Sequence, residues 1–590
     1  MSREHAGRLY DGLSFEPLAK DIEGYSLVKA RADCFAAFAV ACLSIPQALA
    51  YSVVANVPPI AGIISMVLGT MISALLSSSS HLVIGPNNAT SILVQAAAAE
   101  LFSKVYTGGD RLEVSIELIT VLTLFIGLTQ IIAALCKLGR LIQFVSQSVV
   151  VGYFVGTALA ITVAQLFPFF GIFCPDSAES LFAKLHYLFT HLGELHVITL
   201  LVGIGSIVFL FLFRSIKNIP SSITMIVVMT LIVALFDLSS LQDSRGKTIA
   251  LLQCGDVSGI TPSYASPVLD LYSMNLILPV AFAIALIGML EANSIAKSIA
   301  VTTGQRLNKN QEVFALGCAN FFLCFFHGIP CSGSSSRTIV NVQHKAQTRF
   351  AAMFSGVIVA VVVYFLGSLV QYVPKASLAA LLVATAFRMV DYSQLKLCIR
   401  STRADGLVLF VTFFACVFFS MPLAFYMGVA LSIILFLRKA AIPHVVEYTF
   451  REETGELRPA SEEERKLPHP IRFINVEGEL FFGAVDLFQH TLRTIAEDDV
   501  TTKVIVLRIK HVHEVDATTA LALQQLKYYL DKSNRHLIVC SIPAHVVELL
   551  EKSHLSQVLG AKNMIPCDHS SQSEVLEKAL QRARELLGSE

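Results

Sequence analysis

The most constraining feature of this sequence is a set of long stretches that contain no charged residue. No Asp, Glu, Lys or Arg occurs between Cys34 and Ala99, and the same holds for residues 141–175, 271–290, 350–374 and 406–437. A helix that crosses the hydrocarbon core of a bilayer needs about 20 mostly apolar residues. A single soluble core could not bury so many stretches of this length, so the chain is predicted to be a polytopic integral membrane protein.

The composition excludes several other classes of protein. Only 15% of the 590 residues are charged, and the formal net charge is zero, which gives no indication of a nucleic-acid partner. No Walker loop or nucleophile elbow is present, so an enzyme is not expected. His511, His513 and Glu514 lie close together in sequence but lack a further zinc ligand set, so neither a metal nor a cofactor is predicted.

Hydropathy divides the chain into about fourteen membrane segments, in two sets of seven separated by a polar loop over residues 239–270. The first set is expected at 33–55, 58–77, 86–100, 115–136, 142–170, 197–214 and 219–238. The second set is expected at 275–302, 311–328, 335–347, 351–371, 375–390, 405–420 and 422–440.

Lys and Arg are concentrated in the even-numbered loops between these segments, and cytoplasmic loops carry the excess of positive charge. Both termini are therefore expected in the cytoplasm, with the protein in an inner or plasma membrane. Residues 1–30 are interpreted as a cytoplasmic N-terminal segment and residues 31–440 as the transmembrane transport domain.

After Lys439 the composition changes to that of a soluble domain. Residues 441–470 are interpreted as a charged linker, and residues 471–590 alternate between strand and helix patterns. Strands are expected at 471–477, 503–509 and 536–541, and helices at 484–497, 516–532, 544–553 and 573–587. The predicted fold is thus an all-α polytopic membrane domain followed by a small cytoplasmic α/β domain.

Two of the membrane segments are short and begin with polar residues, and they occupy matching places in the two sets. The third opens with Gly85-Pro86-Asn87-Asn88, and the tenth opens with the run from Ile329 to Thr338, which contains Ser334 and Ser336. Hydrocarbon does not tolerate unpaired backbone groups, so such segments must be buried in protein or line a wet cavity. Matching interrupted helices indicate the binding site of an inverted-repeat transporter. The alternative interpretation is a pair of proline kinks with locally satisfied polar groups.

Two half-helices that begin at the bilayer midplane favour an anion as the ligand. Their N-terminal N–H groups and positive dipole ends would face the cavity. Asn87, Asn88, Ser334 and Ser336 are residue types that cap helices and donate hydrogen bonds to ligands. They are therefore candidate substrate-binding residues.

Arg337 and Glu291 are candidate charged groups of the same site. A buried arginine requires a partner, and Glu291, in the eighth segment, is the expected one, although both residues could have a purely structural role. Two helix ends of about +0.5 each and one guanidinium give about +2, which matches a divalent oxyanion when Glu291 is protonated. With Glu291 ionised the sum is about +1, which suits a monovalent ion. Glu291 is therefore a candidate coupling-ion residue, for a proton or for sodium.

These residues resemble the sulfate permease (SulP) family of anion transporters, over nearly the whole chain. The similarity is carried by Ser44-Ile45-Pro46-Gln47-Ala48-Leu49-Ala50-Tyr51, by Val57 to Gly62, by Glu291 to Asn320 and by Gly328 to Thr338. The resemblance implies a fold of two inverted seven-span repeats, with a core bundle that moves like an elevator against a gate bundle in a homodimer. It also implies that Gln47 and Tyr51 line the site. The Asn87-Asn88 pair departs from the apolar or small residue usual in the family after this Gly-Pro.

The C-terminal domain resembles a STAS domain, the module of anti-sigma-factor antagonists. The resemblance rests on Val506-Leu507-Arg508-Ile509 and on Val515 to Ala520. It implies a phosphorylatable hydroxyl near this turn, so Thr518 and Thr519 are candidate regulatory residues. Ordinary helix initiation with Asp516 as N-cap explains the same residues.

The predicted function is secondary active transport of an inorganic anion, with sulfate first, by elevator-type alternating access. A bicarbonate or dicarboxylate carrier, coupled to sodium or exchanging chloride, is the alternative within the class. An anion channel or membrane motor on the same scaffold is a second alternative, and Glu291 argues against it because an intramembrane carboxylate is typical of cation coupling. A sensor anchored by its membrane part, or a nucleobase carrier, fits less well.

Overall fold

The computed structural model describes most of the chain, in two compact units over residues Met1–Ser432 and Ile433–Glu590. The described residues are 13, 16–105, 111–139, 145–174, 181–213, 221–238, 249, 264, 267, 271–442, 444–451, 456–465, 467–477, 483–511, 516–567 and 572–588. Most of the predicted polar loop 239–270 lies outside these ranges. His513 and Glu514, which were considered above as zinc ligands and not predicted to bind a metal, also lie outside them.

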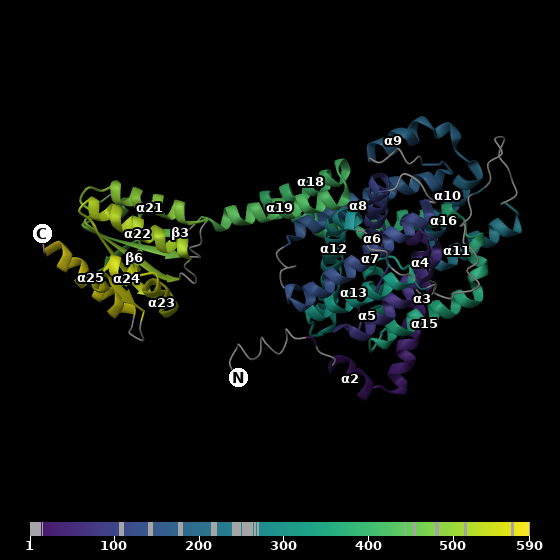
Figure 1. Cartoon of the computed structure of the whole chain (residues 1–590), viewed down its shortest axis with the longest axis horizontal. Helices are drawn as coiled ribbons and strands as arrows, with labels where there is room; N and C mark the ends of the chain where they lie inside the picture. The colour runs from purple at the N-terminus through teal and green to yellow at the C-terminus, as the bar shows by residue number, and fades with distance from the viewer. Residues whose placement is uncertain are drawn as a thin grey trace. The chain divides into compact units, whose positions relative to one another are not determined.

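The first unit is helical, and each predicted membrane segment contains a helix (Figure 1). The first seven segments contain α3 (Leu27–Val54), α4–η1–α5 (Pro59–Leu76), α6 (Asn88–Val105), α7 (Arg111–Leu135), α8 (Gln147–Phe170), α10 (Val197–Leu212) and α11 (Ser221–Leu235). The second seven contain α12 (Leu271–Thr303), α13 (Lys309–Leu323), α14 (Ser335–Gln343), α15 (Phe350–Leu366), α16 (Lys375–Met389), α18 (Arg403–Phe418) and α19 (Met421–Ala440).

Seven helical segments among the described residues are long and apolar enough to cross a membrane on length and composition. Three further helices were not expected from hydropathy: α2 (Glu16–Glu23), α9 (Leu181–Thr190) and α17 (Tyr392–Ser401). The outer surface of the unit is apolar, and Phe211 of α10 is 74% exposed and Phe365 of α15 is 73% exposed. Such side chains are normal where lipid is the solvent.

The helices pack as two bundles. The first, here called the core bundle, contains α3 to α7 and α12 to α15, in which α7 packs on α13 and α3 packs on α15. The second, here called the gate bundle, is centred on α8, which packs against α16 and α18, with α10 and α11 alongside. α19 approaches the gate bundle through Gly428, where an added Cβ would lie 2.3 Å from Oγ1 of Thr412. Small residues allow this kind of close helix packing in membranes.

The two short helices of the core bundle, α6 and α14, are preceded by two short strands, β1 (Ile84–Gly85) and β2 (Ser332–Gly333). The strands form an antiparallel pair, with Ile84 opposite Gly333 and Gly85 opposite Ser332. This pairing satisfies backbone groups that would otherwise be unpaired within the bundle. It also brings the starts of α6 and α14 together.

The second unit contains a six-stranded sheet of order β4-β3-β5-β6-β7-β8. Its strands are β3 (His444–Arg451), β4 (Glu456–Pro459), β5 (Ile471–Glu477), β6 (Val504–His511), β7 (His536–Ile542) and β8 (Met564–Pro566). Strands β5 to β8 are parallel, and β3 pairs antiparallel with both β4 and β5. The three strands expected from the sequence are the buried central ones.

Helices cover both faces of this sheet (Figure 1). One face carries a core formed with α21 (Val485–Glu497), α22 (Ala517–Lys532), α23 (Ala544–Lys552) and α24 (Leu555–Leu559). The other face packs on α25 (Gln572–Gly588) through Val575, Ala579 and Ala583. The region that we interpreted as a linker is partly folded, since β3, β4 and α20 (Glu462–Arg465) lie within residues 441–470.

Candidate anion-binding site

The starts of the two half-helices lie side by side in the core bundle. Beyond the β1–β2 pair, the backbone N–H of Ser334 donates to the carbonyl of Val83 at 3.0 Å. The backbone N–H of Val83 donates to Oγ1 of Thr338 at 3.1 Å. Two positive helix ends therefore point toward one region of the protein, which is the electrostatic arrangement that the sequence predicted for a negative solute.

Asn87 is the N-terminal cap of α6, and the residue is 6% exposed. Its Oδ1 accepts hydrogen bonds from the backbone N–H of Thr90 at 2.9 Å and from Oγ1 of Thr90 at 2.8 Å. Its Nδ2 donates to Oε2 of Glu291 at 2.5 Å and to the carbonyl of Gly333 at 3.1 Å. Both amide atoms of this predicted ligand therefore already have partners within the protein.

Asn88, the first residue of α6, has the opposite environment. It is 5% exposed, and neither its amide nitrogen nor its amide oxygen has a hydrogen-bond partner among the described residues. The hydroxyl of Ser91, three residues later, is buried and has no such partner either. Residues three apart lie on the same side of a helix. Ser91 is not among the site residues predicted from the sequence, although its spacing from Asn88 would have identified it.

Gln47 and Tyr51 extend the site from α3. Nε2 of Gln47 donates to Oγ of Ser336 at 3.4 Å, and its Oε1 is buried with no partner among the described residues. The hydroxyls of Ser334 and Ser336 lie 3.4 Å apart at the start of α14. The structure thus brings α3 and α14 together here, and Tyr51, one turn after Gln47, is 5% exposed. Leaving a buried polar atom without a hydrogen-bond partner destabilises the folded protein, so Oε1 of Gln47 is available to bind a ligand.

Arg337, in the first turn of α14, is fully buried. Its Nη2 donates to the carbonyl of Pro86 at 2.7 Å, and its Nη1 donates to Sδ of Met66 at 2.9 Å. A Cβ at Gly85 would lie 3.2 Å from both of these nitrogens, which explains why glycine precedes Pro86. The guanidinium therefore fixes the turn before α6 and supplies positive charge from behind it.

Glu291 does not form the direct ion pair with Arg337 that we expected. Oε2 of Glu291 accepts from Asn87 and, at 2.9 Å, from Oγ of Ser332. The backbone of β2 packs closely against α12 next to Glu291, since a Cβ at Gly333 would be only 2.8 Å from Cα of Ala292. The physical reason for the difference is that neutral donors at the two helix starts reach the carboxylate, whereas Arg337 is held by Pro86 and Met66.

A buried amide pair supports the backbone before α14. Nδ2 of Asn320 donates to Oε1 of Gln130 at 2.8 Å and to the carbonyl of Cys331 at 3.1 Å. Its Oδ1 accepts from the backbone N–H of Cys331 at 2.7 Å. These bonds connect α7 and α13 to the irregular segment that leads into β2. They leave the chain at Cys331 with little freedom to move independently of those helices.

The regulatory candidates of the C-terminal domain differ in accessibility. Oδ1 of Asp516 accepts from the backbone N–H and from the hydroxyl of Thr519, both at 2.7 Å, so Asp516 caps α22. Thr519 is fully buried, whereas Thr518 is exposed. Thr518 is therefore the hydroxyl that an enzyme could reach, and phosphorylation there remains a prediction.

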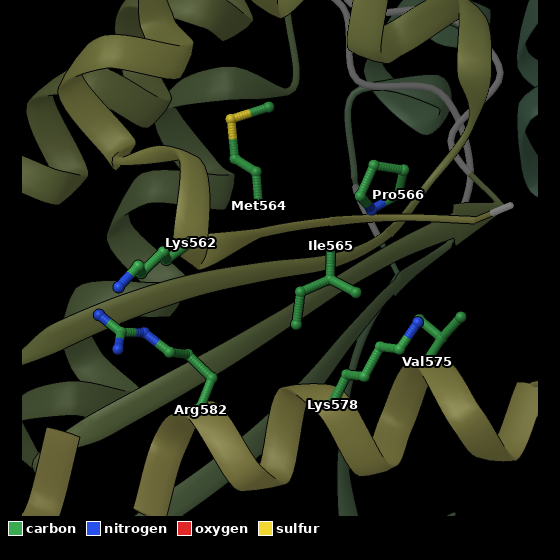
Figure 2. Close-up of a pocket in the computed structure, with 7 residues that line it drawn as sticks. All are labelled: Lys562, Met564, Ile565, Pro566, Val575, Lys578 and Arg582. Atoms are coloured by element: carbon green, nitrogen blue, oxygen red, sulfur yellow. The ribbon is translucent and has the colours of Figure 1, made fainter. Parts of the chain in front are cut away.

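A pocket of about 320 Å³ lies between β8 and α25 of the same domain (Figure 2). Ile565 points from β8 toward the helix, and the side chains of Lys562 and Arg582 point toward one another. Arg582 is held by Oδ1 of Asn563 at 3.0 Å and by Oε2 of Glu585 at 2.9 Å. With Lys578 also in its lining, the pocket is positively charged.

The fold and this site define a class of protein. Two sets of seven membrane segments, each with a broken helix whose start faces the other, are the architecture of a membrane transport protein. The sulfate permease family matches residues 31–412, and the STAS domain matches residues 464–569. The chain belongs to the sulfate permease family and carries a C-terminal STAS domain.

Curated relatives agree with this assignment along nearly the full length. A putative sulfate transporter of Bacillus subtilis is 25% identical over 93% of this chain and 98% of its own. A probable sulfate transporter of Mycobacterium tuberculosis is 28% identical over 90% of this chain and 92% of its own. The sodium-independent sulfate anion transporter of Bos taurus is 25% identical over 91% and 87%, respectively. The chain is thus similar to transporters rather than to enzymes.

Solved structures show the same fold. The murine anion transporter Slc26a9 in its inward-facing state aligns with a TM-score of 0.84 at 20% identity, over 96% of this chain and 94% of that chain. The transmembrane domain of the cyanobacterial bicarbonate transporter BicA aligns with a TM-score of 0.58 at 20% identity, over 69% of this chain and 98% of that chain. The membrane domain and the STAS domain therefore occur together in a known architecture.

Proposed function

We propose that this protein is a secondary active transporter of a small inorganic oxyanion, with sulfate as the first substrate to test. The observation that supports this proposal is the meeting of two positive helix ends beside buried polar atoms that have no protein partner. Asn88, Ser91 and Gln47 supply these atoms. The names of the relatives in Bacillus, Mycobacterium and cattle support sulfate as the substrate class.

The proposed transport cycle moves the core bundle against the gate bundle. Most of the proposed ligand residues belong to α3, α6 and α14, which pack together in the core bundle. A site carried by one bundle can pass from one side of the membrane to the other without being rebuilt, as rigid-body alternating access requires. We propose a homodimer as the assembly in which this movement takes place, as the family resemblance implies.

Glu291 is the proposed coupling residue. Among the described residues, it is the only carboxylate that contacts the starts of both half-helices. These contacts are made with Asn87 before α6 and with Ser332 before α14. A proton or a sodium ion at this carboxylate would raise the net positive charge beside the anion site by one. Cation binding would then favour anion binding in the same conformation.

A monovalent oxyanion such as bicarbonate is the second candidate. The observation that favours it is the position of Arg337, whose two terminal nitrogens are occupied by Pro86 and Met66. Among the described residues only Nε of its guanidinium is buried without a partner, so most direct contacts to the anion would come from neutral donors and helix ends. With Glu291 ionised, such a site carries about +1.

Uptake into proteoliposomes tests the proposal. Radiolabelled sulfate, bicarbonate, chloride and dicarboxylates would be compared under imposed proton and sodium gradients. Saturable uptake of one oxyanion is expected, and Arg337→Ala is expected to lower it at least tenfold, because the turn before α6 and one buried charge are lost together. Monodispersity in detergent controls for folding. If wild-type protein transports none of these anions under any gradient, the proposed function is wrong.

A further inference from the structure

The two adjacent asparagines at the start of α6 have different hydrogen-bond partners. This difference indicates how cation binding at Glu291 could be coupled to anion binding. Asn87 connects three parts of the site: Glu291 on α12, the carbonyl of Gly333 in β2, and the first turn of α6 through Thr90. Asn88 has no partner for either amide atom among the described residues. One asparagine is therefore fully engaged with the protein, and the other is available to a ligand.

The orientation of the Asn87 amide is fixed by groups that can play only one role. The backbone N–H of Thr90 can only donate, so the atom that faces it must be Oδ1. The carbonyl of Gly333 can only accept, so the atom that faces it must be Nδ2. It follows that Glu291 receives a hydrogen bond from Nδ2, and that rotation of the amide by half a turn would break both backbone contacts.

The bond between Asn87 and Glu291 depends on the charge of the carboxylate. A hydrogen bond to an ionised acceptor is roughly twice as strong as one between neutral groups. Nδ2 and Oε2 are 2.5 Å apart, which is closer than the roughly 2.7–3.2 Å usual for an N–H···O bond. Neutralising Glu291 therefore weakens one of the contacts that fix Asn87, which is also the cap of the helix that presents Asn88 and Ser91.

Building on the proposed function, we propose that Asn87 is a positioning residue that transmits the charge state of Glu291 to the anion-facing start of α6. When Glu291 is ionised, Asn87 is held toward β2 and α12. When Glu291 carries a proton or a bound cation, the hydrogen bond from Asn87 to Glu291 is weakened, and the first turn of α6 can adjust to the anion. Asn87 is thus assigned to coupling, and Asn88 to anion contact.

Other charged or titratable groups act on Glu291 and must be considered in a test. Arg337 of α14, Tyr51 of α3 and Tyr153 of α8 interact with it electrostatically. The neighbouring helices α7 and α13 bring Gln130 and Asn320 to this region, which do not titrate. Asn87 and Ser332 are the neutral residues whose side chains contact the carboxylate directly, and Ser332 is the weaker candidate for coupling because it caps no helix.

The test compares Asn87→Ser with the matched variant Asn88→Ser in full-length protein reconstituted into liposomes. Serine retains an N-cap oxygen for α6 but has no amide group to reach Glu291. Uptake of the transported oxyanion is measured over a range of external pH, with and without sodium. For Asn87→Ser, the midpoint of the pH profile is expected to move upward by about one pH unit, the equivalent of one lost charge-assisted hydrogen bond. If sodium is the coupling ion, the apparent sodium affinity should change by about tenfold instead.

Asn88→Ser should lower the apparent anion affinity at every pH and leave the midpoint in place. Asn87→Asp is the second variant, since it keeps both the size and the cap but turns a carboxylate oxygen toward Glu291. It should shift the midpoint in the same direction and further. Normal uptake with superimposable pH and sodium profiles in wild type and both Asn87 variants would overturn the inference alone. Uptake that responds to neither pH nor sodium in wild type would overturn it as well, whereas no uptake of any anion overturns the proposed function.

Discussion

Arg472 is the residue around which one edge of the STAS domain is organised. Its side chain is 5% exposed, and it pairs with Glu447 of β3 at 2.6 Å and with Asp499 at 3.1 Å, each of which is 11% exposed. Asp499 also accepts hydrogen bonds from the backbone N–H of His469 at 3.0 Å and from the hydroxyl of Thr501 at 2.6 Å. Breaking such a buried network from one side leaves an uncompensated charge, at a cost of about 3 kcal/mol or more.

This network predicts a loss of stability of the STAS domain in acid. Burial alone would raise the pKa of Asp499, but hydrogen bonds from Thr501, from the backbone of His469 and from Arg472 hold that pKa well below its usual range. A carboxyl whose pKa is depressed by folding stabilises the fold above its unfolded pKa of about 3.9, and this contribution is lost as the pH falls through the folded value. The free energy of unfolding, measured by urea denaturation, should therefore begin to fall below about pH 4.

The variant Asp499→Asn separates this residue from the other carboxylates. It should cost about 1–3 kcal/mol at neutral pH, because an amide group then faces hydrogen-bond donors. Its stability should also fall less steeply with acid than that of the wild-type domain. Glu548→Gln, at an exposed i,i+4 pair with Lys552, is the control and should change neither quantity appreciably. If the unfolding free energies of wild type and Asp499→Asn fall in parallel as the pH is lowered, Asp499 does not contribute to the loss of stability in acid.

At the scale of single elements, the contact of α7 with α13 depends on glycine. A Cβ added to Gly127 would lie 2.5 Å from the backbone nitrogen and 2.8 Å from Cα of Phe321, and neither atom belongs to a side chain that could rotate away. A Cβ at Gly317 would lie 2.8 Å from the backbone nitrogen of Ile131. The two helices are therefore packed backbone to backbone, as small residues allow in membranes.

We predict that Gly127→Ala destabilises the membrane domain, because the helices must separate to admit one methyl group. Overpacking of this kind costs about 1–3 kcal/mol, against a gain of up to about 1 kcal/mol from the higher helix propensity of alanine. Thermal unfolding of the purified protein in detergent would measure the effect. Gly205→Ala in α10, where the nearest atom would be Cε of Met229 at 3.4 Å, is the matched control. It should be neutral or slightly stabilising, and an equal response of both variants would contradict the close-packing argument.

The elements that could be predicted from the sequence are those with one strong local signal. Hydropathy predicted fourteen membrane segments, each of which contains a helix, and the paired Gly-Pro and Ser-rich openings located α6 and α14. Strands β3 and β4 were missed because their sequences are rich in charge and fit an exposed edge as well as a linker. The partners of Arg337 and Asn87 were missed for a different reason: they are backbone carbonyls, a thioether and a carboxylate from distant parts of the sequence, which only the folded core bundle brings together.

At the scale of the whole molecule, the C-terminal domain has cores of its own on both faces of its sheet. It is therefore expected to fold when separated from the membrane domain, provided that the fragment includes the edge formed by β3 and β4. His444 to Tyr448 of β3 pair with Phe473 to Glu477 of β5. Tyr448, Phe450 and Leu457 of that edge pack against the core on the α25 side.

We predict that a fragment of residues 442–590 is monomeric and unfolds cooperatively, whereas a fragment of residues 471–590 aggregates or unfolds with a lower free energy. The shorter fragment exposes the unpaired edge of β5, which is a template for association between chains. It also removes Glu447 and leaves Arg472 buried with one carboxylate fewer, so a difference of about 3 kcal/mol or more is expected. Size-exclusion chromatography and urea denaturation followed by circular dichroism would compare the two. Equal unfolding free energies of the two fragments would mean that β3 and β4 do not contribute to the stability of the domain. The domain would then begin at Ile471, where its sequence pattern becomes regular.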